Sequence, residues 1–196
     1  MFNRVTADGY FASAEGALDW QVPDAEMDAN IATGLSTGER GAVLFGRKTY
    51  EMFAGFWPNV LAQGDKAENP HAPGERSPVM QRMAQWLDAA EKVVFSTTLQ
   101  EATWRNTRIA RTIDPKEIEE MKRRPGEGIM IFGSGSIVSQ LTAHGLIDEY
   151  WFVVTPVLLG QGRSLFRDIP VRTSLVLCEA TAHKSGNVTL RYEPKR

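Results

Sequence analysis

Cysteine is almost absent from this sequence, since Cys178 is the single one among 196 residues. An intramolecular disulfide needs two cysteines, and most structural zinc sites need several thiolates, so both are excluded. The three histidines, His71, His144 and His183, are far apart and have no cysteine or paired carboxylates beside them. We therefore predict no metal site and a reducing compartment.

Long apolar runs and an excess of one charge are also lacking. No stretch reaches the roughly 18 apolar residues of a membrane-spanning helix, and charged residues interrupt the N-terminal region where a signal peptide needs an apolar core. The 22 Lys and Arg nearly balance the 24 Asp and Glu, for a net charge of −2. We therefore expect a soluble, cytoplasmic protein whose partner is a small molecule rather than nucleic acid or a membrane.

No internal repeat with a period of 20–50 residues is present, and the length suits a single domain spanning residues 1–196. Short apolar strands alternate with helical patterns and end in a hairpin around Ser185-Gly186-Asn187. This alternation predicts an α/β fold whose sheet is mostly parallel with an antiparallel end. The expected strands are Phe2–Ala7, Ala42–Phe45, Lys92–Ser96, Ile129–Phe132, Asp148–Thr155, Ser174–His183 and Val188–Tyr192.

Two helix starts and one long loop complete the expected outline. Met27, Ile31 and Leu35 recur at helical spacing behind Asp24, which is a typical N-cap residue. Asp114-Pro115 starts another helix, which we expect to end near Pro125-Gly126. Residues 58–78 contain four prolines and few apolar residues, so we expect a long mobile loop that could close over a site.

Three turns that follow strands have the composition of phosphate-binding sites. Helix N-termini offer unpaired N–H groups and a partial positive charge, and Gly46-Arg47-Lys48-Thr49 adds two cations and a hydroxyl to them. A solvated, positively charged first turn is the alternative. Gly133-Ser134-Gly135-Ser136 resembles half of a dinucleotide fingerprint but has Val138 at the third glycine; the alternative is a tight turn with Ser134 or Ser136 as helix cap. Ser96-Thr97-Thr98 could bind a phosphate or simply end a strand.

Other chemistries find little support. No G-x-S-x-G motif occurs, and Cys178 lies in an alternating strand pattern, so a hydrolase nucleophile is not indicated. Tryptophans are most often core residues, but Trp20 and Trp57 flank irregular segments and are the better candidates for ligand contact.

Taken in order, six motifs resemble those of the dihydrofolate-reductase-like superfamily. The chain is most similar to stand-alone relatives of the reductase domain of the bifunctional riboflavin-biosynthesis deaminase/reductase, from about residue 2 to 193. The resemblance implies a three-layer α/β fold with a mixed, mostly parallel sheet of about eight strands flanked by helices. The motifs are Asp8-Gly9-Tyr10-Phe11, Leu18-Asp19-Trp20, Leu44-Phe45-Gly46-Arg47-Lys48-Thr49-Tyr50-Glu51, Val94-Phe95-Ser96-Thr97-Thr98, Ile131-Phe132-Gly133-Ser134-Gly135 and Thr155-Pro156-Val157-Leu158-Leu159-Gly160.

The resemblance also implies NADPH as the cofactor, bound across the carboxyl ends of the strands. By position, Gly46, Arg47, Lys48 and Thr49 would hold the phosphates, with Arg47 as the candidate for the adenosine 2′-phosphate. Ser96, Thr97 and Thr98 match the adenosine side. Gly133, Ser134, Gly135, Ser136 and Ile137 match the turn beside the pyrophosphate and nicotinamide.

On the substrate side, the superfamily carries an acidic residue in its first helix, and here the register leaves two candidates. Ala25 stands at the nominal position, between Asp24 and Glu26, and Asp24 has the alternative role of helix cap. The resemblance pairs that carboxylate with the Thr155 hydroxyl. Asp8 is an alternative polar contact or a turn-forming residue, and Trp20 and Trp57 are expected near the substrate.

The zinc signature of the deaminase half is missing, so only reductase chemistry remains. The expected activity is hydride transfer from NADPH to a C=N or C=O carbon of a small pterin- or pyrimidine-like heterocycle. A non-catalytic nucleotide- or flavin-binding member of the same fold is the alternative. Relatives of this type pair as homodimers through their late strands, and the apolar run Trp151–Leu159 would supply such a surface.

Overall fold

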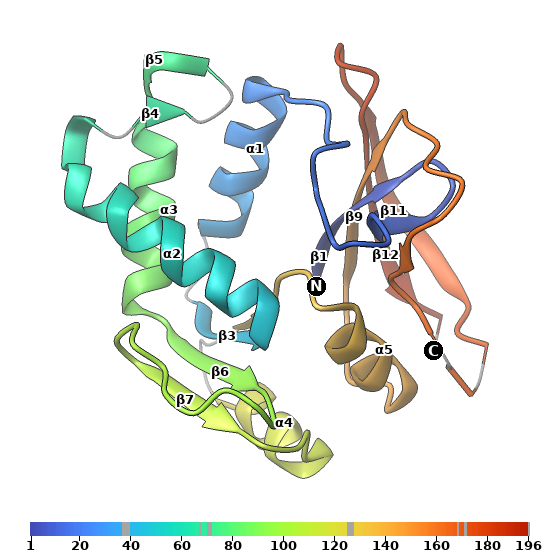
Figure 1. The fold of residues 1–196 in the computed structure, drawn as a ribbon. Coiled ribbons are helices and arrows are strands. Elements are labelled where there is room, and N and C mark those ends of the chain that lie inside the picture. The colour runs from blue at the N-terminus through green and yellow to red at the C-terminus, as the bar shows by residue number, and fades with distance from the viewer. Residues whose placement is uncertain are drawn as a thin grey trace. The chain divides into compact units, whose positions relative to one another are not determined.

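The computed structural model describes residues 1–36, 40–66, 68–69, 72–124, 128–167, 169–170 and 172–195 (Figure 1). His71 and the expected helix end near Pro125-Gly126 lie outside these ranges. The chain forms two compact units, each assembled from separate segments. Unit 1 comprises Met1–Val22, Ile113–Glu119 and Ile131–Arg196, and unit 2 comprises Pro23–Thr112 and Glu120–Met130.

Unit 2 is built around a sheet with the strand order β7-β6-β3-β8. Strand β3 pairs in parallel with β6, and β6 pairs in parallel with β7. Val43, Leu44 and Phe45 are fully buried, as expected for a parallel strand covered on both faces. The strands are β3 (Arg40–Gly46), β6 (Glu91–Phe95), β7 (Thr107–Ala110) and β8 (Gly128–Ile131), the last of which ends in unit 1.

The first helix of unit 2 begins at the expected cap. Asp24 Oδ1 accepts a hydrogen bond from Met27 N at 2.9 Å, which confirms Asp24 as a cap of the first helix. Figure 1 shows α2 and α3 packed beside each other in this unit. The helices are α1 (Ala25–Ser36), α2 (Arg47–Gln63), η1 (Gly64–Lys66) and α3 (Pro78–Ala89), while α4 (Pro115–Lys122) is shared by the two units.

The prediction of a loop over residues 58–78 is wrong for much of this segment. Helix α2 continues through Pro58 to Gln63, and two short strands, β4 (Glu68–Asn69) and β5 (Ala72–Arg76), pair with each other before α3. A proline inside a helix removes one backbone hydrogen bond. Here Val60 packs against Ala84 of α3, with Trp57 and Leu61 beside them, so apolar contacts with α3 keep the helix intact beyond the proline.

Unit 1 contains a second sheet with the order β1-β9-β12-β11. Strand β9 pairs in parallel with β1 and antiparallel with β12, and β11 and β12 form the predicted C-terminal hairpin. Helix α5 (Gly135–Ala143) follows the glycine turn, and the short strands β2 (Tyr10–Ala12) and β10 (Arg163–Ser164) pair with each other. The sheet strands are β1 (Phe2–Thr6), β9 (Tyr150–Thr155), β11 (Leu175–Ala182) and β12 (Val188–Pro194). The expected α/β class, with parallel strands flanked by helices and an antiparallel end, is confirmed.

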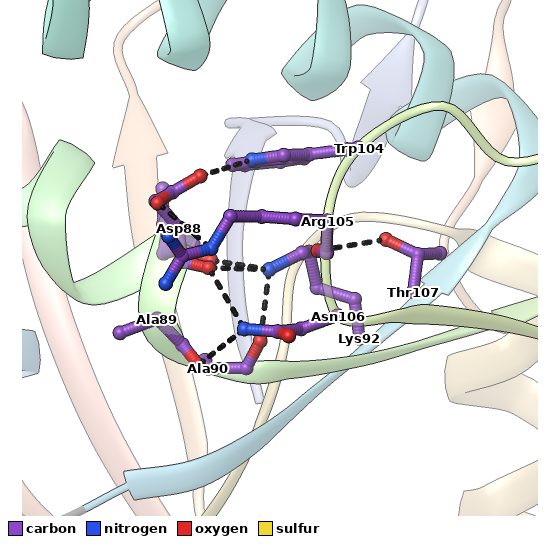
Figure 2. A network of polar contacts seen from close by, with 9 residues as sticks. Asp88, Ala89, Ala90, Lys92, Trp104, Arg105, Asn106 and Thr107 are labelled. Carbon is purple, nitrogen blue, oxygen red and sulfur yellow. Dashed lines mark hydrogen bonds and ion pairs between the residues drawn. The ribbon is translucent and has the colours of Figure 1, made fainter.

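A buried lysine anchors β6 to the end of α3 (Figure 2). Lys92 is fully buried, and its ammonium donates to the carbonyl oxygens of Leu87, Asp88 and Ala90 at 2.7, 3.2 and 2.8 Å. The ammonium also lies 4.6 Å from the centre of the Trp104 ring, a cation–π distance. These carbonyls belong to the C-terminal turn of α3, where a cation satisfies acceptors that lack a partner within the helix.

Among the described residues, no helix combines the length and the apolar character needed to cross a lipid bilayer.

Candidate functional site

The first candidate turn lies where β3 passes directly into α2. Gly46 is the N-cap residue in an extended conformation and makes no side-chain cap. Arg47 and Lys48 are exposed on the first turn of the helix, and Arg47 Nη1 lies 3.2 Å from Glu51 Oε1. Two cations at a helix N-terminus oppose the helix dipole, and Glu51 offsets part of that repulsion.

The second candidate turn follows β6 in the same unit. The Ser96 hydroxyl oxygen accepts hydrogen bonds from Thr98 N at 3.2 Å and Leu99 N at 2.9 Å, which closes a tight turn. Ser96 is nearly buried, whereas the side chains of Thr97 and Thr98 are exposed. The turn therefore ends the strand and also leaves two hydroxyl groups at the surface.

Strand register brings these two turns together and adds a residue that the sequence did not single out. Gly46 pairs with Phe95, and Phe95 pairs with Ala110, in three adjacent parallel strands. The next residues along each strand are Arg47, Ser96 and Arg111, so they follow one another across the carboxyl edge of the sheet.

Arg111 is bonded directly to the Ser96 turn. Its Nη1 donates to Ser96 O at 2.9 Å and to Leu99 O at 2.7 Å, while the side chain stays exposed. The only sequence signal for Arg111 was its place after the four-residue segment TRIA, which is too short to be recognised as a strand by pattern. The guanidinium of Arg111 thus lies on the hydroxyl turn, and Arg47 begins the helix that follows the adjacent strand β3; arginines and hydroxyls are residue types suited to a phosphate.

The third candidate turn, after β8, lies in unit 1. Gly133 and Ser134 both adopt left-handed conformations, with φ of 55° and 58°. Ser134 is the N-cap residue of α5, but its side chain makes no capping hydrogen bond, and Ser136 is already inside the helix. Ser134 therefore holds the N-cap position that one alternative gave it, without a side-chain capping bond, whereas Ser136 does not, and the tight turn is confirmed. A Cβ at Gly135 would lie 2.8 Å from Phe11 Cε1, so glycine is needed there for close packing.

The carboxylates expected on the substrate side have different environments. Asp24 caps α1, as described above, and Glu26 is exposed in the first turn of that helix. Both belong to unit 2, whereas Thr155 and Asp8 belong to unit 1. Two roles were considered for Asp24, helix cap and acid. The hydrogen bond from Met27 N supports the role of helix cap.

Asp8 holds a second loop in place. Its Oδ1 accepts from the Thr6 hydroxyl at 2.5 Å, and its Oδ2 accepts from Leu159 N at 3.0 Å and Gly160 N at 2.7 Å. The Thr6 hydrogen bond, with help from the two amides, holds the pKa of Asp8 below its ordinary value despite some desolvation. Asp8 therefore joins the β1–β2 turn to the loop that follows β9.

The other substrate-side candidates are largely buried. Thr155 is fully buried in β9, and Trp20 is 8% exposed. Trp57 is half-buried on α2, where its ring centre lies 6.1 Å from that of Phe53 and 5.2 Å from that of Phe56. The packing of Trp57 against Val60 makes it part of the core of unit 2. Within the described ranges, no three His, Cys, Asp or Glu side chains gather into a set that could hold a metal ion.

Three solved structures illustrate which proteins share the fold of this chain. A candidate riboflavin biosynthesis protein of Shewanella sp. PV-4 is 20% identical, with a TM-score of 0.70 and coverage of 100% of this chain and 97% of that chain. A pyrimidine reductase-like protein of Corynebacterium diphtheriae is 13% identical, with a TM-score of 0.61 and coverage of 100% and 90%. The Thermotoga maritima diaminohydroxyphosphoribosylaminopyrimidine deaminase/5-amino-6-(5-phosphoribosylamino)uracil reductase is 15% identical, with a TM-score of 0.62 and coverage of 99% and 55%.

Sequence relatives and a family model cover nearly the whole chain. The Bacillus subtilis protein YyaP is 28% identical over 193 residues, which is 96% of this chain and 90% of YyaP. The model of the RibD C-terminal domain matches residues 1–189. This match includes all three strand-end turns, and the chain belongs to the RibD C-terminal domain family.

Proposed function

We propose that this protein is an NADPH-dependent reductase that transfers a hydride to a C=N or C=O carbon of a small pterin- or pyrimidine-like heterocycle. The observation that carries the proposal is the row of Arg47, Ser96 and Arg111 across the carboxyl ends of three adjacent parallel strands. Ligands of open α/β sheets bind at this edge. Membership of the RibD C-terminal domain family supports reductase chemistry on such a heterocycle.

The residues of unit 2 fit the phosphate groups of the cofactor. Arg47, Arg111 and the exposed hydroxyls of Thr97 and Thr98 would hold a phosphate monoester, with the arginines providing charge-assisted hydrogen bonds. Gly46, Lys48, Thr49 and Ser96 complete the proposed set in this unit. In unit 1, the residues proposed for the pyrophosphate and nicotinamide are Gly133, Ser134, Gly135, Ser136 and Ile137, which form the left-handed turn and the start of α5.

Bound NADPH supplies the hydride, and the protein mainly orients the reactants. Trp20, Asp8 and Thr155 remain the proposed substrate-side residues of unit 1, and Asp24, Glu26 and Trp57 those of unit 2. Asp24 is a helix cap and Glu26 is exposed, so neither carboxylate is held in a buried acidic environment. In this proposal the proton would come from a carboxylate that shifts on substrate binding or from water.

Titration of the purified protein with NADPH and with NADH tests the cofactor proposal. Binding is detected through quenching of tryptophan fluorescence and through nicotinamide fluorescence. We expect saturable binding of both with a preference for NADPH, because only NADPH carries the 2′-phosphate. Failure to bind either nucleotide would overturn the cofactor assignment and leave the family and the fold untouched.

The exposure of Glu26 and the cap formed by Asp24 also favour a second candidate, a member that binds the nucleotide or a flavin without turnover. NADPH binding without consumption across panels of pterins, pyrimidines and simple carbonyl compounds would favour this candidate over the reductase.

A further inference from the structure

Three buried polar atoms of unit 1 have no hydrogen-bond partner among the described residues. They are the Thr155 hydroxyl oxygen, the Asn187 side-chain oxygen and the Trp20 indole nitrogen. Thr155 and Asn187 are fully buried, and Trp20 is 8% exposed. Buried polar groups in folded proteins are nearly always paired with protein or with ordered water, so these atoms point to a bound molecule.

The antiparallel register between β9 and β12 points from Thr155 toward Asn187. Val154 of β9 pairs with Val188, the first residue of β12, and continuing this register by one residue brings Thr155 opposite Asn187. Residues directly opposite in such a ladder have side chains on the same face of the sheet. The next residues, Pro156 and Gly186, are also close to each other, because a Cβ at Gly186 would lie 3.1 Å from Pro156 Cγ.

Asn187 also holds the segment that carries Trp20. Its Nδ2 donates to Val22 O at 3.1 Å and to the Ser185 hydroxyl at 2.9 Å, which fixes the orientation of the amide. The side-chain oxygen of Asn187 therefore remains an acceptor. Trp20 is two residues before Val22, so its indole belongs to the segment bonded to Asn187.

We propose that Thr155, Asn187 and Trp20 bind one internal water molecule in unit 1. The Thr155 hydroxyl and the Trp20 N–H donate to the water oxygen, and the water donates one hydrogen to Asn187 Oδ1. Two donors and one acceptor give the three hydrogen bonds typical of a buried water. An alcohol hydroxyl from a ligand has the same hydrogen-bonding pattern, but a site with no exposed polar atom favours water over a group that must enter from the surface.

The water joins three parts of unit 1 that are distant in sequence. These are the segment around Trp20, the end of β9 at Thr155 and the hairpin turn that leads into β12. The orientation of the Trp20 indole then depends on the water, since the indole N–H has no other acceptor in the described structure. Thr155 and Trp20 are also proposed substrate-side residues, but this inference does not rest on the reductase activity, because it is argued only from the three buried polar atoms.

A high-resolution crystal structure of the wild-type protein, grown without polyols, tests the proposal directly. We expect an ordered oxygen at hydrogen-bond distance, about 2.6–3.2 Å, from Thr155 Oγ1 and Asn187 Oδ1. A direct hydrogen bond between Thr155 and Asn187, with no oxygen between them, would overturn it. This measurement needs no variant, so poor folding of a variant leaves the test intact.

Variants give an independent test in solution. Counting long-lived internal waters by oxygen-17 magnetic relaxation dispersion should show one fewer in Thr155→Val than in wild type, and no loss in Thr155→Ser, which keeps the hydroxyl. Thr181→Val is the matched control, because Thr181 is exposed on β11. An unchanged count in Thr155→Val would contradict the proposal.

Discussion

Arg47 is the side chain on which the proposed NADPH preference most depends. It is exposed at the start of α2, and its present partner is the exposed carboxylate of Glu51 at 3.2 Å. A surface ion pair of this kind is weak, so Arg47 can exchange Glu51 for a phosphate at little cost. We expect Arg47→Ala to weaken NADPH binding by roughly tenfold or more, the range for losing a charge-assisted hydrogen bond, and to leave NADH binding within about twofold.

Fluorescence titration of both nucleotides measures this difference, and Arg82→Ala is the matched control because Arg82 is an exposed arginine on α3 that is not among the proposed cofactor residues. Arg111→Ala should also weaken NADPH binding, but it removes the two bonds that hold the Ser96 turn, so its NADH affinity should fall as well. Equal losses for the two nucleotides in Arg47→Ala would exclude Arg47 from the 2′-phosphate.

Asp24 allows a clean separation of structural and acidic roles. Asparagine caps a helix about as well as aspartate, whereas alanine loses the cap at a typical cost of about 1 kcal/mol. We expect Asp24→Asn to keep the free energy of unfolding within about 0.5 kcal/mol of wild type and Asp24→Ala to lose about 1 kcal/mol.

Because the structure shows the cap, turnover of Asp24→Asn is expected to match that of the wild-type protein in a steady-state assay. A loss of tenfold or more in kcat/KM with unchanged stability, about 1.4 kcal/mol or more in activation free energy, would instead assign the proton to Asp24.

Lys92 makes the stability of the α3–β6 connection depend on pH. Burial lowers the pKa of Lys92 from 10.5 to about 8, against a raising effect of Asp88, while Arg105 lowers it further. Between these two pH values the unfolded chain binds more protons than the folded one, so the free energy of unfolding rises with pH.

The expected rise between pH 8 and 10.5 is about 3 kcal/mol in denaturant titrations, and it should be absent from Lys92→Met. The variant should also be less stable than wild type at pH 7, because the carbonyls of Leu87 and Ala90 lose their donor. If the free energy of unfolding had the same pH dependence in wild type and in Lys92→Met, Lys92 would not titrate in this range.

Strand β11 is the surface through which we expect two copies of the chain to pair. Among the described strands it pairs with β12 alone, and all eight of its residues are exposed, including Leu175, Val176 and Leu177. The expected dimer surface, Trp151–Leu159, instead lies largely in β9, between β1 and β12. An apolar edge strand with unpaired backbone groups favours pairing with a second strand of its own kind.

Size-exclusion chromatography with light scattering should therefore measure a molar mass about twice that of the single chain, which is 21.8 kDa. Leu177→Lys should give a monomer because it places a charge in the paired edge, while Thr181→Lys, near the end of the same strand, should have a smaller effect. A monomeric wild-type protein would contradict the dimer.

Much of the fold was predictable because its signals are local. Asp24 and Asp114 were recognisable as caps from residue type and spacing, and the structure shows both accepting backbone hydrogen bonds, from Met27 N and Lys116 N. The Ser185-Gly186-Asn187 turn likewise predicted the terminal hairpin.

Local sequence signals missed two features, the continuation of α2 beyond Pro58 and the place of Arg111. Both features depend on contacts between residues that are distant in sequence. Pro58 indicates a helix end by itself, and only packing on α3 shows that α2 continues. Strand β7 is too short to have a pattern, so the place of Arg111 beside Ser96 emerges only from its pairing with β6.

The α/β class, the family resemblance and the three strand-end turns could be read from the amino-acid sequence, since composition, caps and glycine positions are properties of short segments. The folded chain was needed to show that Arg47, Ser96 and Arg111 follow strand ends at one edge, that Asp8 binds the loop after β9, and that the β9–β12 register runs from Val154 toward Thr155 and Asn187. These contacts follow from strand register, which is set by packing of the whole sheet rather than by any one segment.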